Sequence, residues 1–244
     1  MWTDVTELAR FYAQPMGRTV SRLVCARLRA RGPARADERV LGLGFAPPYL
    51  GPFRGAERVL AFMPAPQGVL RWPEQGPASA ALVDETALPL TDAAVDRVLL
   101  VHCLETTDSG RALLREVWRV LAPKGRITVV APNRRGLWAR TERTPFGQGR
   151  PFSRGQLAGL LRETPFEPLE WREALLAPPL FLSWTLRWAR AWERIGTLLW
   201  PAFAGVIVVE AEKRLHAPIP AMAKRFVREP VLAPTIGAPG VPPI

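Results

Sequence analysis

The residues best suited to chemistry stand just after two apolar segments in the middle of the chain. His102, Cys103, Leu104 and Glu105 close the apolar run 97–102, and Asn133 follows the run 126–131. An imidazole can serve as a base near neutral pH, and a carboxylate three residues away can orient it. A single histidine at a strand end more often has a structural role. His102 is therefore a candidate base or a pocket wall, and the catalytic residue stays unassigned.

The two apolar segments read as strands on either side of one helix. Residues 111–121 show the 3.6-residue period of a helix through Leu113, Leu114 and Val117. Ser109 or Asp108 can cap its first turn. Both strands are Val-, Leu- and Ile-rich without polar alternation, which is typical of parallel strands covered on both faces. Such strand–helix–strand units bind ligands beyond the carboxyl ends of their strands, where the polar residues lie.

The stretch from 80 to 133 resembles the class I S-adenosylmethionine-dependent methyltransferases, most closely their broad small-molecule type. The resemblance rests on motifs that occur in the expected order: Asp84, Leu88-Pro89, Asp96-Arg97-Val98, His102-Cys103-Leu104-Glu105 and Leu121-Ala122-Pro123-Lys124-Gly125-Arg126. It covers roughly residues 39–212. It implies an α/β, Rossmann-like, doubly wound and mostly parallel seven-stranded sheet with an antiparallel last strand at 206–211. It also implies S-adenosylmethionine as the cofactor.

The resemblance assigns a set of cofactor-binding residues. They are Gly42 and Gly44 at the end of a first strand at 39–44, Ala46 after it, and then Asp84, Glu85, His102 and Leu104. By the resemblance Asp84 would accept a hydrogen bond from the adenine amino group. A loop-end acid that caps a turn is the alternative for Asp84.

The sequence departs from the family pattern at two places. Gly42 stands at the usual acidic position, Ala46 replaces a glycine, and Pro47 and Pro48 remove two backbone donors. After the second strand, 58–62, the family's acid is missing and no Asp or Glu occurs before Glu74. Gln67 is a possible replacement for one of its functions.

Three functions are therefore considered. The first is a methyltransferase that acts on an unidentified small molecule or protein. The second is a methyltransferase-like binding or assembly protein that has lost strong cofactor binding, which the departures favour. The third is an RNA-binding protein, because the net charge is +11. Methyl transfer needs alignment of donor and acceptor rather than a metal, and neither cysteine belongs to a metal-ligand cluster.

We expect three parts: a helical arm at 1–36, a methyltransferase-like domain at 37–212 and a Pro-rich extended or disordered tail at 213–244. The arm, broken near Pro15, is expected to pack on the sheet edge or over the cofactor pocket, or else to meet a protein or membrane surface. Another helix is predicted by tryptophans that recur at every fourth residue, Trp184, Trp188 and Trp192. This apolar stripe is expected to pack on the sheet or close the acceptor pocket, or else to contact a membrane surface. The tail is a second possible partner site. The sequence contains no uninterrupted apolar run of about 18 residues, so a membrane-spanning helix is not expected. We expect a cytoplasmic protein.

Overall fold

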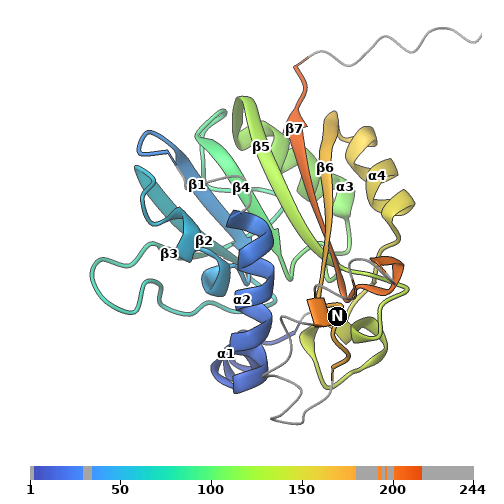
Figure 1. Cartoon of the computed structure of the whole chain (residues 1–244). Coiled ribbons are helices and arrows are strands. Elements are labelled where there is room, and N and C mark those ends of the chain that lie inside the picture. Colours follow the sequence, from blue (N-terminus) through green and yellow to red (C-terminus); the bar gives the residue numbers. More distant parts are fainter. Residues whose placement is uncertain (1–2, 30–34, 180–191, 194–195, 197–200, 216–244) are drawn as a thin grey trace, which may run out of the picture.

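The computed structural model describes residues 3–29, 35–179, 192–193, 196 and 201–215. Its centre is a seven-stranded sheet with the strand order β3-β2-β1-β4-β5-β7-β6 (Figure 1). The strands are β1 (Arg39–Gly44), β2 (Arg58–Pro64), β3 (Ala80–Val83), β4 (Val95–Val101), β5 (Leu121–Pro132), β6 (Phe166–Ala174) and β7 (Val206–Lys213). Strands β1 to β5 pair in parallel, and β7 runs antiparallel to both β5 and β6. The expected mixed sheet is confirmed.

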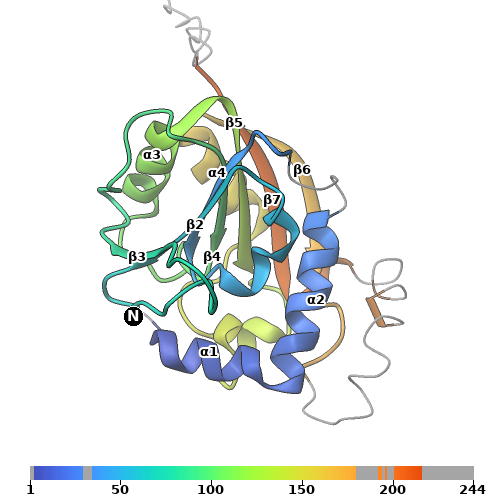
Figure 2. The ribbon, with the colours of Figure 1, turned by 90° about the vertical axis from the view of Figure 1, so that its left-hand side faces the viewer.

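Helices cover both faces of this sheet. They are α1 (Val5–Ala13), α2 (Pro15–Arg29), α3 (Gly110–Val120) and α4 (Arg154–Glu163). On β4, Val98 and Leu100 belong to the core beneath α3 and α4, whereas Leu99 and Val101 belong to the core beneath α2. Figure 2 shows α3 and α4 on one side of the sheet and α2 on the other. This alternation explains why the central strands are apolar throughout.

The helices begin at the residues that local chemistry favours. The Ser109 side chain accepts a hydrogen bond from the backbone of Ala112 at the start of α3. Ser153 and Gln156 form a reciprocal capping box at the start of α4. The predicted break in the arm is also found, because Gln14 separates α1 from α2 and Pro15 occupies the first position of α2.

The connections from β1 to β2 and from β2 to β3 are fully described and contain no α-helix. Residues 45–57 form two short 3-10 turns, Pro47–Tyr49 and Gly51–Phe53, and residues 65–79 form irregular turns. Prolines at 47, 48 and 52 remove backbone donors that a helix would need. The α2 helix, which comes from the arm, packs over this face.

Some predictions fall on residues that the structure does not describe. Trp184 and Trp188 of the tryptophan stripe and the tail beyond Leu215 lie outside the described ranges. Across those ranges, no helix is both long enough and apolar enough to cross a bilayer.

The start of β1 is held by an ion pair that makes stability depend on pH. Asp96 accepts hydrogen bonds from the Arg39 backbone and guanidinium at 2.9–3.0 Å, and this lowers the pKa of the Asp96 carboxyl. Its stabilising effect is present above the unfolded pKa of about 4 and is lost as the pH falls through the lower folded value. We expect Asp96→Asn to reduce the free energy of unfolding by about 1 kcal/mol at neutral pH. Urea unfolding should show this difference shrinking as the pH falls below about 4, and a difference that stays constant down to acid unfolding would contradict the assignment.

Candidate functional site

The strand order reverses between β1 and β4. The chain runs from β1 outward to β2 and β3, then returns to the other side of β1 with β4. In open α/β sheets, ligands bind outside the carboxyl ends of the strands at such a reversal. We call this place the switch-point crevice, defined by Gly44 at the end of β1 and His102 after β4.

The end of β1 approaches β4 so closely that only glycine fits. Gly44 has φ +85°, and a Cβ there would lie 2.1 Å from the carbonyl oxygen of Val101 and 2.7 Å from Cβ of Cys103. Gly42 is also constrained, because its Cβ would lie 2.6 Å from that of Ala46. The glycines expected at the cofactor loop are thus required by the packing of the strand ends.

A chain of buried polar side chains begins at His102. The Nδ1 of His102 lies 3.2 Å from Oε1 of Glu105, and its Nε2 lies 2.7 Å from the hydroxyl of Tyr12. The Tyr12 hydroxyl is 2.6 Å from that of Tyr49. All four side chains are at most 8% exposed. This contact is the one expected if Glu105 orients His102.

The hydrogen-bond pattern assigns the protons in this chain. A carboxylate can only accept, so Glu105 accepts a hydrogen bond from the Nδ1–H of His102. In the tautomer that carries its proton on Nδ1, Nε2 accepts from the Tyr12 hydroxyl, and the Tyr12 hydroxyl accepts from that of Tyr49. Burial raises the pKa of both tyrosine hydroxyls, so both stay protonated and able to donate.

Gln67 closes the crevice from the β2 side. Its Nε2 donates a hydrogen bond to the carbonyl oxygen of His102 at 3.0 Å. Because β1 separates β2 from β4, the segment after β2 must cross about two strand spacings, or roughly 10 Å, to make this contact. The Gln67 side chain is 1% exposed, and its bridge runs over the carboxyl end of β1.

The α1 helix lies across the same strand ends (Figure 2). The backbone N–H of Val5 donates to the Gln67 carbonyl at 2.8 Å, and Leu8 is fully buried. The Tyr12 ring stacks on Phe45 with centroids 5.7 Å apart and an interplanar angle of 23°. The arm therefore packs over the expected cofactor pocket, and the chain's own side chains fill the crevice in this arrangement.

The other predicted site residues are distributed unevenly. Ala46 is buried behind Gly42, and Leu104 is buried next to the crevice. Asp84 lies at the exposed end of the edge strand β3 and accepts hydrogen bonds from the backbone and hydroxyl of Thr86 at 2.8 and 2.7 Å, which lower the pKa of its carboxyl. Glu85 accepts from Thr107 at 3.1 Å. In the part of the chain that the structure describes, neither acid is hydrogen-bonded to a member of the His102 chain.

Sequence reasoning missed Tyr12 and Tyr49 as members of the site. Tyr12 lies on a helix that precedes the sheet by many residues, and nothing in its local sequence links it to His102. One signal was present: these are the only two tyrosines in the chain. Gln67 was noted only as a possible replacement for a missing acid, and its buried bridge to His102 was not foreseen.

Two grooves flank the crevice. The lateral groove, about 1010 Å³, lies between the arm and the segment after β2 and is lined by Tyr12, Phe45, Pro47, Val59 and Trp72 among others. The second groove, about 560 Å³, lies between the starts of α3 and α4 and includes Leu104, Arg134, Arg150 and Phe152. Tyr12 and Phe45 thus form a wall between the lateral groove and the buried His102 chain.

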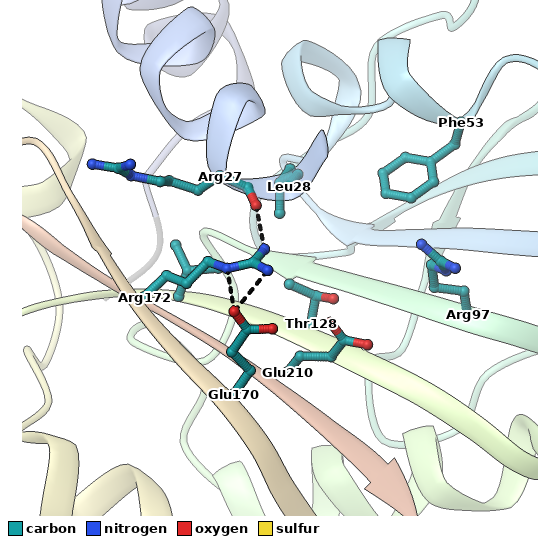
Figure 3. Close-up of a pocket in the computed structure, with 9 residues that line it drawn as sticks. Arg27, Leu28, Phe53, Arg97, Thr128, Glu170, Arg172 and Glu210 are labelled. Carbon is teal, nitrogen blue, oxygen red and sulfur yellow. Dashed lines mark hydrogen bonds and ion pairs between the residues drawn. The ribbon is translucent and has the colours of Figure 1, made fainter. Parts of the chain in front are cut away.

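A third depression, on the α2 side of the sheet, is filled by ion pairs that hold the fold together. Figure 3 shows Arg172 held between the backbone carbonyl of Arg27 at 2.6 Å and the Glu170 carboxylate at 2.7 Å. Arg97 pairs with Glu38 at 2.9 Å and lies over the Phe53 ring. The space left is about 20 Å³, close to the volume of a single water, so no organic ligand fits. In the described part of the chain, no three His, Cys, Asp or Glu residues are grouped to hold a metal.

Comparison with known proteins relates the crevice to a family. Residues 41–129, which include the crevice, match the family described as "Methyltransferase domain". The segment that carries the crevice is therefore similar to a methyltransferase domain. No curated protein matched the chain.

Solved methyltransferase structures share the fold. One is a possible histamine N-methyltransferase from Thermotoga maritima, with a TM-score of 0.59, 18% identity, and coverage of 86% of this chain and 96% of that one. A chain from the complex of the Haloferax volcanii Trm112 activator with a putative methyltransferase matches with a TM-score of 0.61 and 18% identity. The match covers 87% of this chain and 99% of that one. Geranyl diphosphate C-methyltransferase from Streptomyces coelicolor, in complex with S-adenosyl-L-homocysteine, matches with a TM-score of 0.52 and 14% identity. The match covers 78% of this chain and 76% of that one. That last structure holds the demethylated product of S-adenosylmethionine, which is the cofactor that the sequence resemblance implies for this chain.

The polar atoms at the crevice fit this cofactor. Oε1 of Gln67 and Oε2 of Glu105 are buried acceptors without a hydrogen-bond partner among the described residues. An unpaired buried acceptor is unfavourable, and the hydroxyl and ammonium groups of the cofactor are donors. Two buried acceptor oxygens are thus present although the acid expected after β2 is absent.

The tight approach at Gly44 gives a direct test of this geometry. We expect Gly44→Ala to destabilise the methyltransferase by about 3 kcal/mol or more, because both the positive φ and the Val101 carbonyl oppose a Cβ. Gly159→Ala, at an open position inside α4, is the control and should raise stability by about 0.5–1 kcal/mol. Urea unfolding measures both, and equal stability of Gly44→Ala and the wild type would contradict the described strand ends.

Proposed function

We propose that the protein transfers the methyl group of S-adenosylmethionine to a small-molecule or protein acceptor at the switch-point crevice. The observation that carries the proposal is the pair of unpartnered, buried acceptor oxygens of Gln67 and Glu105 at the strand-order reversal of a methyltransferase sheet. When bound, the cofactor supplies an electrophilic methyl group. The chain's own residues have to bind, align and shield it.

The residues at the crevice divide these tasks. Gly44 lets the end of β1 meet the end of β4 without an intervening side chain. Gln67 and Glu105 offer the oxygens that accept hydrogen bonds from the ligand. His102, held by Glu105 through Nδ1, presents Nε2 as the atom that would take a proton from an acceptor nucleophile. This role makes His102 the candidate base.

The second groove supplies a place for the acceptor. It is lined by Leu104 after β4 and by Arg134, Arg150 and Phe152 after β5, so it adjoins the segment that contains His102. The backbone N–H of Arg150 donates to the Glu105 carbonyl at 2.7 Å, which ties this wall to the crevice. A small molecule fits its volume of about 560 Å³.

The closed crevice favours one alternative function. A methyltransferase-like protein that no longer binds the cofactor strongly would keep the same fold with Tyr12 and Gln67 permanently in the crevice. Isothermal calorimetry with S-adenosylhomocysteine separates the two. Micromolar binding is expected for the enzyme, and an absence of heat at millimolar ligand would favour the binding or assembly protein.

Two substitutions refine the calorimetric test. Glu105→Gln keeps an acceptor for Nδ1 of His102 but replaces Oε2 by an N–H donor, so the affinity for S-adenosylhomocysteine should fall about tenfold or more. Asp84→Ala should also weaken cofactor binding while folding is retained, if Asp84 accepts from the adenine amino group. An unchanged affinity of either variant would remove that residue from the site.

A further inference from the structure

We propose that α1 is a lid over the switch-point crevice, held shut by the hydrogen bond from Tyr12 to His102, and that it must lift for the cofactor to bind. This inference rests on the proposed function, since the cofactor is the ligand that the lid would exclude. In the arrangement described, the Tyr12 hydroxyl occupies the acceptor Nε2 of His102, and the Tyr12 ring covers the strand ends.

The polar contacts that hold α1 shut lie near its two ends. Near its start, the Val5 N–H donates to the Gln67 carbonyl at 2.8 Å. Near its end, the Tyr12 hydroxyl bonds to His102 and Tyr49 at 2.7 and 2.6 Å. Between them, α1 buries the apolar side chains of Leu8 and Phe11, and the Phe11 ring lies edge-on to that of Phe146. A helix held by few polar contacts and one apolar face can detach while the sheet stays folded.

The joint between α1 and α2 provides the hinge. Gln14 alone separates the two helices, and its ψ of 160° is extended rather than helical. Beyond the joint, α2 is fixed to the sheet. The Arg27 guanidinium donates to the Glu173 carbonyl at 3.0 Å, Arg172 donates to the Arg27 carbonyl at 2.6 Å, and Val24 is fully buried. Hinges are commonly a few residues at the ends of elements that absorb the backbone change.

The unpartnered atoms show why a ligand would compete with the lid. With α1 shut, Oε1 of Gln67 and Oε2 of Glu105 have no partner in the described structure. A ligand with hydroxyl and ammonium donors satisfies both of them, whereas α1 brings only the Tyr12 hydroxyl to His102. The ligand thus favours the open arrangement, and its apparent affinity is reduced by the fraction of molecules that are closed.

The lateral groove offers a route to the crevice. Tyr12 and Phe45 line this groove on one side, and Tyr12 bonds to the buried His102 chain on the other. Withdrawal of Tyr12 joins the groove of about 1010 Å³ to the crevice. A nucleoside-sized ligand fits such a volume.

Tyr12→Phe tests the lid because it removes one hydroxyl and leaves the ring stack with Phe45. We expect it to bind S-adenosylhomocysteine about tenfold more tightly than the wild type, since the closed state alone loses the hydrogen bond. Amide hydrogen exchange should speed up across 5–13 and stay unchanged in β4. The control, Val117→Ala, removes buried volume from α3 on the opposite face; it should lower stability without either effect.

A second variant loosens the other end of the lid. Val5→Pro removes the N–H that donates to Gln67, at the first helical position, where proline is well tolerated. The preceding Asp4 has φ −62° and ψ 138°, which suits a residue before proline. We expect faster exchange across α1 and tighter ligand binding, with a smaller effect than that of Tyr12→Phe.

The outcomes separate the lid from the proposed function. Faster exchange of α1 together with tighter binding in both variants supports the lid. The lid is overturned if the wild type binds S-adenosylhomocysteine but the variants show either the same amide exchange in α1 or the same affinity as the wild type. Selectively faster α1 exchange without ligand binding in any variant leaves α1 as a hinged cap and overturns the cofactor assignment instead.

Discussion

The hydrogen bond between Tyr12 and His102 is the contact on which the arrangement of the site depends. It joins the arm to the end of β4 and continues through Glu105 on one side and Tyr49 on the other. Buried polar groups are tolerated only when they are paired, so this chain of contacts fixes where α1 sits. The crevice is closed as a direct consequence.

The position of the arm follows from what the sheet lacks. The connections after β1 and β2 are too rich in proline and turns to form helices, which leaves one face of the sheet short of cover. The α2 helix packs on that face, and α1, joined to it through Gln14, is thereby brought over the strand ends. The absence of α-helices from these two connections and the closure of the crevice are in this way parts of one arrangement.

Local patterns were sufficient to predict the sheet and much of its helical cover. The strand at 39–44 has the predicted bounds and Ser109 caps α3 as predicted, because an apolar run and a capping serine are local signals. Asp84 shows the limit of such signals. An acid after a strand has the same sequence pattern whether it binds a ligand or caps a turn, and in the described structure Asp84 accepts hydrogen bonds from Thr86. The Tyr12–His102 contact joins residues distant in the chain and depends on how the arm folds back, which no local pattern encodes.

The tyrosines report on the central claim directly, because the sequence contains only Tyr12 and Tyr49. The titratable groups that face Tyr12 are Tyr49, His102, Glu105 and, from α2, Cys25. Burial raises the pKa of both hydroxyls, so the closed form is fully stabilised below about pH 10 and loses stability above it.

The decisive measurement is a phenolate difference-absorbance titration with and without saturating S-adenosylhomocysteine. Without ligand, neither tyrosine should ionise before the protein unfolds. With ligand, Tyr12 should be released and one tyrosine should titrate near its ordinary pKa of about 10. A crevice closed by Tyr12 would be contradicted if neither tyrosine ionised near pH 10 in the ligand-bound protein. It would also be contradicted if one tyrosine ionised near pH 10 in the free, folded protein.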